Sequence, residues 1–307
     1  MGELPSPAAA VPMSSRSTVA PLALAVGALL ISMVSYQCGA ALAKHLFPLV
    51  GAQGATAYRL GLSALILLLW RRPWRRSGGQ RDWRALWGYG LSMGAMNLVF
   101  YMALRTIPLG IAVALEFTGP LALALSGSRR LIDFVWIALV VAGLALLLPL
   151  RAQAQALDPV GVMYALAAGV GWALYIVLGK KAGASHGRDA VTLGTSIGAL
   201  LAIPFGVVHA GGALLSPVLL PYALGVAVLS SALPYSLEMV ALTRLPARTF
   251  GTLLSLEPAI AAVAGAALLD QRLSLLQWMA IVAIIVAATG TALSVRRTEL
   301  VEPPLVN

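Results

Sequence analysis

Long apolar runs separated by short polar breaks are the feature that most constrains this chain. Of its 307 residues, 60% are hydrophobic and only 10% are charged, whereas a soluble domain carries about 25% charged residues. Such a shortage of charge excludes a soluble globule, a disordered chain and a nucleic-acid-binding protein, although the formal net charge is +10. The sequence therefore predicts an integral membrane protein.

Ten of the apolar runs are about long enough to cross a bilayer as helices, and none alternates as a barrel strand would. The predicted fold class is all-α integral membrane, with ten transmembrane helices. Residues 1–18 are expected to form a disordered head, and residues 296–307 a cytoplasmic tail. The expected spans are 19–43, 51–70, 85–104, 108–125, 134–150, 161–178, 190–208, 218–239, 250–269 and 275–295.

The basic residues are distributed unequally between the two sets of loops that ten spans create. With the N-terminus inside, sixteen of the 21 lysines and arginines fall on the cytoplasmic side and four on the other, while Arg59 lies within a span. Cytoplasmic loops of membrane proteins carry an excess of positive charge. The net charge is thus explained by topology, with both termini cytoplasmic.

An internal repeat appears when the chain is shifted by 138 residues. Pro108 then falls on Pro246, and Pro120 on Pro258. The shift spans five helices, an odd number, so the second copy is inverted relative to the first. Two five-helix repeats are expected, over residues 19–150 and 158–295. Inverted repeats are a recurrent design of secondary transporters, whose substrate site lies near the middle of the membrane.

Four ionisable residues lie within the expected spans, namely Arg59, Glu116, Glu238 and Glu257. Such a group costs at least about 2.5–3.5 kcal/mol at the bilayer centre, so it is a functional candidate by default. Arg59, Glu116 and Glu257 lie near the centres of their helices, and Glu238 near an end. The alternative is structural, with Arg59 pairing with a glutamate to lock two helices together.

Two repeat-related prolines accompany the acids. A proline within a helix cannot donate its backbone hydrogen bond, so the carbonyl four residues earlier is freed. For Pro120 this is the carbonyl of Glu116, and for Pro258 it is that of Leu254, on the same helix face as Glu257. Helix breaks beside acids favour a cavity, whereas the alternative is a pair of ordinary packing kinks.

The sequence shows little that points to an enzyme active site, a metal site or a nucleotide-binding site. The segment Gly194–Gly198 fits the esterase pattern G-x-S-x-G, but it lies within an apolar helix and lacks the strand–turn–helix context. The chain has one cysteine and three scattered histidines, none near a span centre, and no nucleotide-binding loop. We expect no enzyme activity, no metal and no cofactor.

Several strings of the sequence resemble the transporters of the EamA family, in the drug/metabolite transporter superfamily. The resemblance covers about residues 37–295 and implies ten helices in two repeats. It also implies a bacterial inner-membrane location and export of small neutral amino acids such as threonine and homoserine. The strings that carry it are residues 39–52 with Arg59, residues 108–120, residues 232–239, and residues 245–252 leading to Glu257 and Pro258.

The predicted function is export of threonine and homoserine by proton antiport, with alternating access of the two repeats. Arg59 is expected to bind the substrate carboxylate, and Glu116 and Glu257 to bind its ammonium group and carry a proton, with Glu238 a further proton-coupling candidate. The alternatives are export of another amino acid or metabolite and, less favoured, a passive channel. Expected partners are the substrate, protons and membrane lipid, with no nucleic acid. The neutral polar candidates for the substrate site are Asn97, Tyr101 and Tyr235.

Overall fold

The computed structural model describes residues 16–75, 82–126, 131–147, 157–187, 189–245 and 253–299. Within these ranges every regular element is a helix and none is a strand, as a backbone in lipid requires because each of its polar groups must bond internally. This confirms the all-α expectation. Residues 1–15 of the predicted disordered head and residues 300–307 of the predicted tail lie outside the described residues.

The helices follow one another along the chain with short connections. Three shorter elements accompany them: 3₁₀ helices at Pro73–Arg75 and Gly211–Leu215, and a π-helical segment, η3, at Val228–Ala232 that joins α7 to α8. The main helices are α1 (Arg16–Arg71), α2 (Trp83–Ala103), α3 (Leu109–Ser126), α4 (Leu131–Leu147), α5 (Pro159–His186), α6 (Asp189–Ala210), α7 (Leu220–Ala227), α8 (Leu233–Arg244), α10 (Glu257–Leu269) and α11 (Leu275–Glu299).

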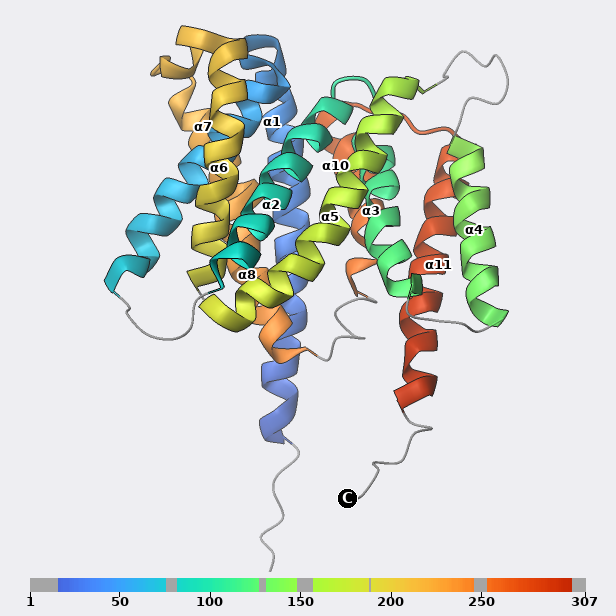
Figure 1. The fold of residues 1–307 in the computed structure, drawn as a ribbon. Coiled ribbons are helices and arrows are strands. Elements are labelled where there is room, and N and C mark those ends of the chain that lie inside the picture. The colour runs from blue at the N-terminus through green and yellow to red at the C-terminus, as the bar shows by residue number, and fades with distance from the viewer. Residues whose placement is uncertain are drawn as a thin grey trace, which may run out of the picture.

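The long element α1 consists of two helices that fold back on each other at Gly51 (Figure 1). Gly51 has φ +68° and ψ 173°, a conformation that glycine adopts readily because it has no Cβ. A Cβ at this position would also collide with the ring of His209 on α6. The two halves of α1 correspond to the expected spans 19–43 and 51–70.

Length and composition mark four stretches of the described chain as able to cross a membrane: Ala23–Arg75, Pro159–His186, Asp189–Leu215 and Leu220–Glu238. The first of them contains both halves of α1. Shorter apolar helices occupy other expected spans, for example Leu109–Leu123 in α3 and Glu257–Leu269 in α10. Several apolar helices are therefore present, while the count of ten spans and the inverted repeat stay predictions.

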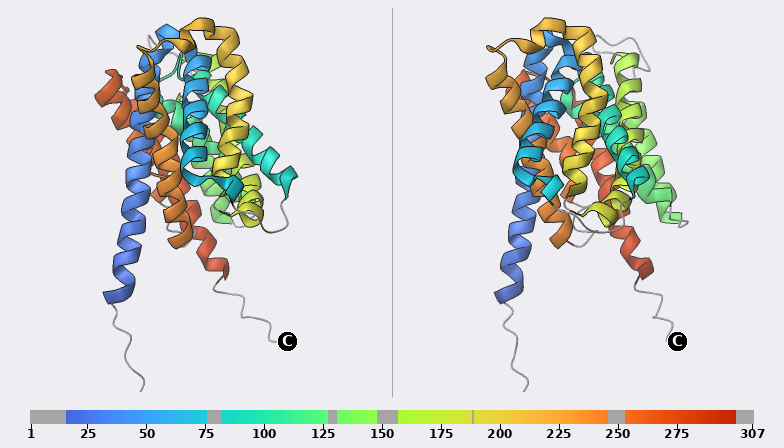
Figure 2. Two further views of the ribbon diagram at one scale, coloured as in Figure 1. Left: turned by 90° about the vertical axis from the view of Figure 1, so that its left-hand side faces the viewer. Right: turned by 60° about the vertical axis from the view of Figure 1, so that its left-hand side comes forward.

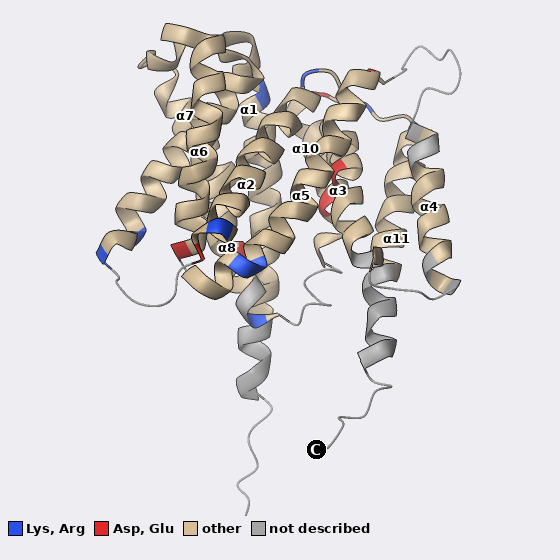
Figure 3. Cartoon of the chain, viewed as in Figure 1, with Lys and Arg blue, Asp and Glu red and all other residues tan. Residues whose placement is uncertain are grey.

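The described helices pack as one bundle, with the start of α1 and the end of α11 at the same end (Figures 1 and 2). Most of the coloured Lys and Arg positions lie toward that end, with others at the opposite end, whereas acidic positions lie deep within the bundle near α3 and α10 (Figure 3). The predicted even number of crossings would place the start of α1 and the end of α11 on one side of a membrane. Which side of the membrane this is stays a prediction.

Apolar side chains cover the outside of the bundle and small residues fill its interior. Val208 is 89% exposed and Val218 79% exposed, and an extensive exposed apolar surface is typical of a protein face that contacts a membrane or another protein. Inside, alanines such as Ala40, Ala112 and Ala165 are fully buried. Small residues let helix backbones approach closely in a membrane, where packing replaces the hydrophobic effect as the force between helices.

Candidate functional site

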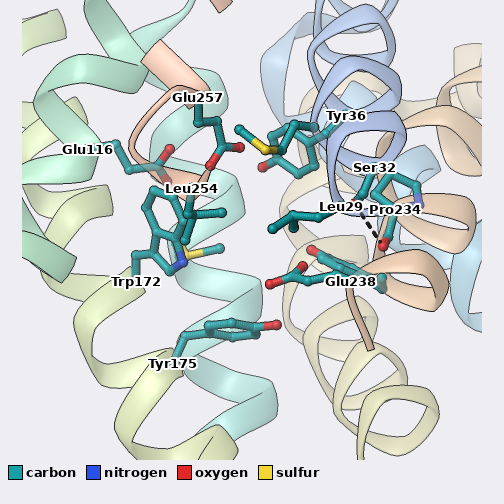
Figure 4. A pocket seen from close by; sticks show the side chains of 13 residues that line it. Leu29, Ser32, Tyr36, Glu116, Trp172, Tyr175, Pro234, Glu238, Leu254 and Glu257 are labelled. Carbon is teal, nitrogen blue, oxygen red and sulfur yellow. Dashed lines mark hydrogen bonds between the residues drawn. The ribbon is translucent and has the colours of Figure 1, made fainter. Parts of the chain in front are cut away.

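A cavity of about 50 Å³ lies inside the bundle. Its walls come from α1, α2, α3, α5, α8 and α10, so residues from both ends of the sequence meet there (Figure 4). A space of this size holds a few water molecules and therefore suits a small solute. The lining residues are Leu29, Ser32, Met33, Tyr36, Met96, Glu116, Trp172, Tyr175, Pro234, Tyr235, Glu238, Leu254 and Glu257.

Three of the four ionisable residues found in the expected spans line this cavity. Glu116 from α3 and Glu257 from α10 lie close together, and Glu238 from α8 lies across the cavity near Tyr175 (Figure 4). The side chains of Glu116 and Glu257 are only 4% and 7% exposed. Carboxylates that share a small, water-poor space repel one another, so the arrangement favours a bound cation or bound protons.

Glu257 reaches the cavity because a helix begins at its position. The backbone turns at Ser255 and Leu256, with the N–H of Leu256 donating to the Leu253 carbonyl at 3.0 Å, and α10 then runs from Glu257. An acidic residue in the first turn interacts favourably with the helix dipole. Pro258 is also in this turn, where its missing N–H removes no helical hydrogen bond. The break thus precedes Pro258, whereas the sequence placed it within a longer helix.

Pro120 lies inside α3, which continues past it to Ser126. The carbonyl that Pro120 frees is that of Glu116, and this oxygen lies against Gly169 of α5, where a Cβ would stand 2.6 Å from it. Gly119 meets the same part of α5, since a Cβ on it would collide with the Gly169 carbonyl. The Glu116 carbonyl that Pro120 frees therefore lies in a close contact between the backbones of α3 and α5.

Adding one methyl group at this contact should push α3 away from α5. We expect Gly169→Ala to lower the free energy of unfolding by about 1–3 kcal/mol, as overpacking does in other cores, and to displace Glu116. Gly183→Ala is the matched control in the same helix, because nothing lies within 4 Å of its added Cβ. Thermal unfolding in detergent compares the two variants, and equal melting temperatures would contradict the prediction.

Arg59, in the second half of α1, is fully buried beside the cavity but does not line it. Its guanidinium lies over the ring of Tyr36, with Cζ 4.6 Å from the centroid, and 5.3 Å from that of Tyr101. Among the described residues Arg59 makes no ion pair with a carboxylate, so the locking pair with a glutamate is not observed. Tyr36 stands between Arg59 and the cavity.

The hydrogen bonds of Arg59 instead go to the π-helical segment. Its Nε donates to the Ser231 hydroxyl at 2.9 Å and its Nη2 to the Ser230 carbonyl at 2.8 Å. Pro234, four residues later, has no N–H, so the Ser230 carbonyl cannot make an α-helical hydrogen bond to that residue. From the sequence, helix breaks are predicted at Pro120 and Pro258 but not at Pro234. Pro234 lies within an expected span, shortly after Ser230 and Ser231.

Serines of α1 attach the same segment to the bundle. Ser35 donates to the Leu229 carbonyl at 2.7 Å, and Ser63, in the second half of α1, donates to the Ala227 carbonyl at 2.9 Å. Ser32 donates to the Pro234 carbonyl at 3.0 Å (Figure 4). In a membrane, hydrogen bonds of this kind stabilise contacts between helices. Hydrogen bonds from α1 therefore hold η3 together with the end of α7 and the start of α8.

The remaining polar candidates divide into two groups. Tyr235 lines the cavity, whereas Asn97 and Tyr101 are fully buried and do not line it. The Asn97 amide donates to the Met93 carbonyl within α2 at 2.8 Å, and Tyr101 packs near Phe47, Phe100 and Arg59. Of the predicted site residues, the structure brings Glu116, Glu238, Glu257 and Tyr235 to the cavity.

Several residues in or beside the cavity were not predicted, because uncharged side chains stand out little in such an apolar sequence. Tyr36 on α1 and Trp172 and Tyr175 on α5 line the cavity, and the last two share a helix face because they are three positions apart. Gln37 donates from Nε2 to Oε1 of Glu257 at 3.2 Å. A glutamine within an apolar run is a signal that a census of all polar residues would have found.

Known proteins with similar sequences cover nearly the whole chain. It is 53% identical to the threonine/homoserine exporter RhtA of Salmonella typhimurium strain LT2, over 94% of this chain and 97% of that protein. The protein of that name from Escherichia coli K12 is 51% identical over the same shares. The model of the EamA-like transporter family matches residues 159–293.

The fold also matches that of a protein solved by crystallography, with a TM-score of 0.56 and 18% sequence identity. The match covers 89% of this chain and 99% of the other. A similarity at such low sequence identity supports the fold alone. Membership of a family is shown by the relatives that are more than 50% identical to this chain. The relatives are transporters rather than enzymes, in agreement with the sequence analysis. Its apolar helices and its relatives together show that this chain belongs to the EamA-like transporter family.

Proposed function

We propose that this chain exports threonine and homoserine across the bacterial inner membrane in exchange for protons. The observation that carries the proposal is the meeting of Glu116, Glu238 and Glu257 at one small buried cavity. The chain is more than half identical to proteins named threonine/homoserine exporter, which directs the choice of substrate.

The chemistry of the cavity suits a small zwitterion with a hydroxyl group. Its ammonium group pairs with the carboxylates of Glu116 and Glu257, because charge-assisted hydrogen bonds are the stronger kind. Ser32 and Tyr235 offer hydroxyls to the substrate side chain. Arg59 supplies positive charge for the substrate carboxylate, and its Nη1 has no hydrogen-bond partner among the described residues. For the Arg59 guanidinium to contact the substrate carboxylate directly, the side chain of Tyr36 must change its rotamer.

Proton coupling follows from competition for the same carboxylates. Either an ammonium group or a proton can neutralise Glu116 or Glu257. A buried carboxylate that has bound neither of them costs free energy because its charge is not compensated. Binding of one then favours release of the other, which is the requirement for exchange. Glu238, across the cavity, provides a further position for the proton.

Alternating access is assigned to the two predicted repeats. The cavity walls α1, α2 and α3 belong to the first repeat, and α5, α8 and α10 to the second. Rocking of two such halves about a central site opens it to each side of a membrane in turn. The basic end of the bundle is assigned to the cytoplasm, together with both termini.

The test of the substrate uses cells that lack their own threonine exporter. Cells that express this protein should grow at threonine or homoserine concentrations that arrest control cells, and should release either amino acid into the medium faster. Equal sensitivity and equal release would contradict the proposal. Competition by a panel of amino acids and other metabolites then tests whether a different solute is the preferred substrate.

A further inference from the structure

Two unpaired acceptors lie together at the hydrogen bond that joins α1 to α10. Gln37 is fully buried behind Glu257 and does not itself line the cavity, and its Nε2 donates to Oε1 of Glu257. Oε1 of Gln37 and Oε2 of Glu257 are both buried, and neither has a hydrogen-bond partner in the part of the chain that the structure describes. A buried acceptor without a donor costs about 1–3 kcal/mol, so the pair calls for a ligand that donates more than one hydrogen bond.

A ligand that satisfies both acceptors and compensates the carboxylate charge is a donor with at least two N–H groups and a positive charge. Both unpaired atoms are acceptors, so a hydroxyl with its single hydrogen serves only one of them. A water molecule can serve both, but it does not compensate the charge of the buried carboxylate. A primary ammonium has three hydrogens and a charge opposite to that of Glu257. Glu116 faces the same part of the cavity (Figure 4) and accepts the third.

We propose that Gln37 is a substrate-binding residue that completes the ammonium subsite with Glu257 and restricts transport to primary amines. Its amide N–H fixes one carboxylate oxygen, and its carbonyl oxygen and the second carboxylate oxygen receive two hydrogens of the substrate. This assignment rests on the proposed function and names the group by which the site selects its substrate. The Gln37–Glu257 bond joins the two predicted repeats, so the substrate binds where they meet.

Uptake of labelled threonine by proteoliposomes containing the full chain tests the assignment. Gln37→Met keeps the length of the side chain and removes both hydrogen-bonding groups. We expect its KM for threonine to rise about tenfold or more, as loss of a hydrogen bond to a charged group predicts. The matched control is Ser35→Ala on the same helix, whose hydrogen bond goes to Leu229 and not to Glu257; its KM should stay within about twofold of the wild-type value.

A second measurement compares the transport of threonine with that of a methylated analogue. The wild type should prefer threonine to N,N-dimethylthreonine, which keeps the charge but has one N–H, and Gln37→Met should lose most of this preference. Unchanged KM and unchanged preference in Gln37→Met would overturn the assignment. If Gln37→Met fails to fold, Gln37→Asn, whose amide is one methylene short of Glu257, has the same expected outcomes.

Threonine binding to the purified protein in detergent separates this inference from the proposed export. Wild type that binds threonine more tightly than Gln37→Met supports the subsite, even if export in cells is not observed. Equal binding by the two overturns the subsite while leaving export possible. Absence of threonine binding to the wild type overturns both.

Discussion

Replacing Glu257 by glutamine should abolish most threonine export and the dependence of export on pH. Glutamine has nearly the same shape and can still bond to Gln37, but it lacks the negative charge and carries no exchangeable proton. Loss of one charge-assisted hydrogen bond corresponds to about a ten- to hundredfold weaker affinity for the substrate. Initial rates in proteoliposomes, measured across a range of pH, report both effects.

The control for this variant removes a carboxylate far from the cavity. Asp158 caps the start of α5 by accepting from the N–H groups of Val160 and Gly161, and an asparagine at this position can cap as well. Asp158→Asn should therefore transport like the wild type. If Glu257→Gln exports as fast as the wild type with the same pH dependence, Glu257 does not carry the proton.

Replacing Arg59 by alanine should reduce both stability and affinity for the substrate. The substitution leaves the Ser230 carbonyl and the Ser231 hydroxyl without the buried donor that each now has, and it removes the cation from the rings of Tyr36 and Tyr101. Together these changes should lower the free energy of unfolding by about 2–5 kcal/mol. Thermal unfolding in detergent and the KM for threonine measure the two effects.

A second substitution distinguishes the structural role of Arg59 from its role toward the substrate. In Pro234→Ala the backbone N–H at residue 234 can bond to the Ser230 carbonyl, so the double variant with Arg59→Ala should regain part of the lost stability. It should not regain affinity for threonine. An unchanged KM in Arg59→Ala would contradict the assignment of this residue to the substrate carboxylate.

The sequence predicted the acidic half of the site because burying a carboxylate in a membrane is costly. Glu116, Glu238 and Glu257 stand out in a chain with eleven acids, and all three line one cavity. Helical periodicity alone could not show which faces of α3, α8 and α10 meet. That depends on close backbone contacts such as the one between Gly119 and Gly169.

The surroundings of Arg59 could not be predicted, for two physical reasons. Its acceptor on η3, the Ser230 carbonyl, has no α-helical hydrogen bond because Pro234 lacks an N–H, and its distance from the cavity is set by the ring of Tyr36, which comes from the other half of α1. That these two groups face Arg59 depends on how the two halves of α1 align after the turn at Gly51. Composition and spacing contain no information on that alignment.

A proton gradient is expected to drive the transport of threonine through this cavity, and proteoliposomes test this most directly. With equal threonine on both sides and a pH difference across the membrane, the wild type should move threonine against its own rising gradient, toward the side from which protons leave. Glu257→Gln should only equilibrate it or fail to move it. Movement that stops at equal concentrations in the wild type, whatever the pH difference, would contradict the account and indicate a passive channel.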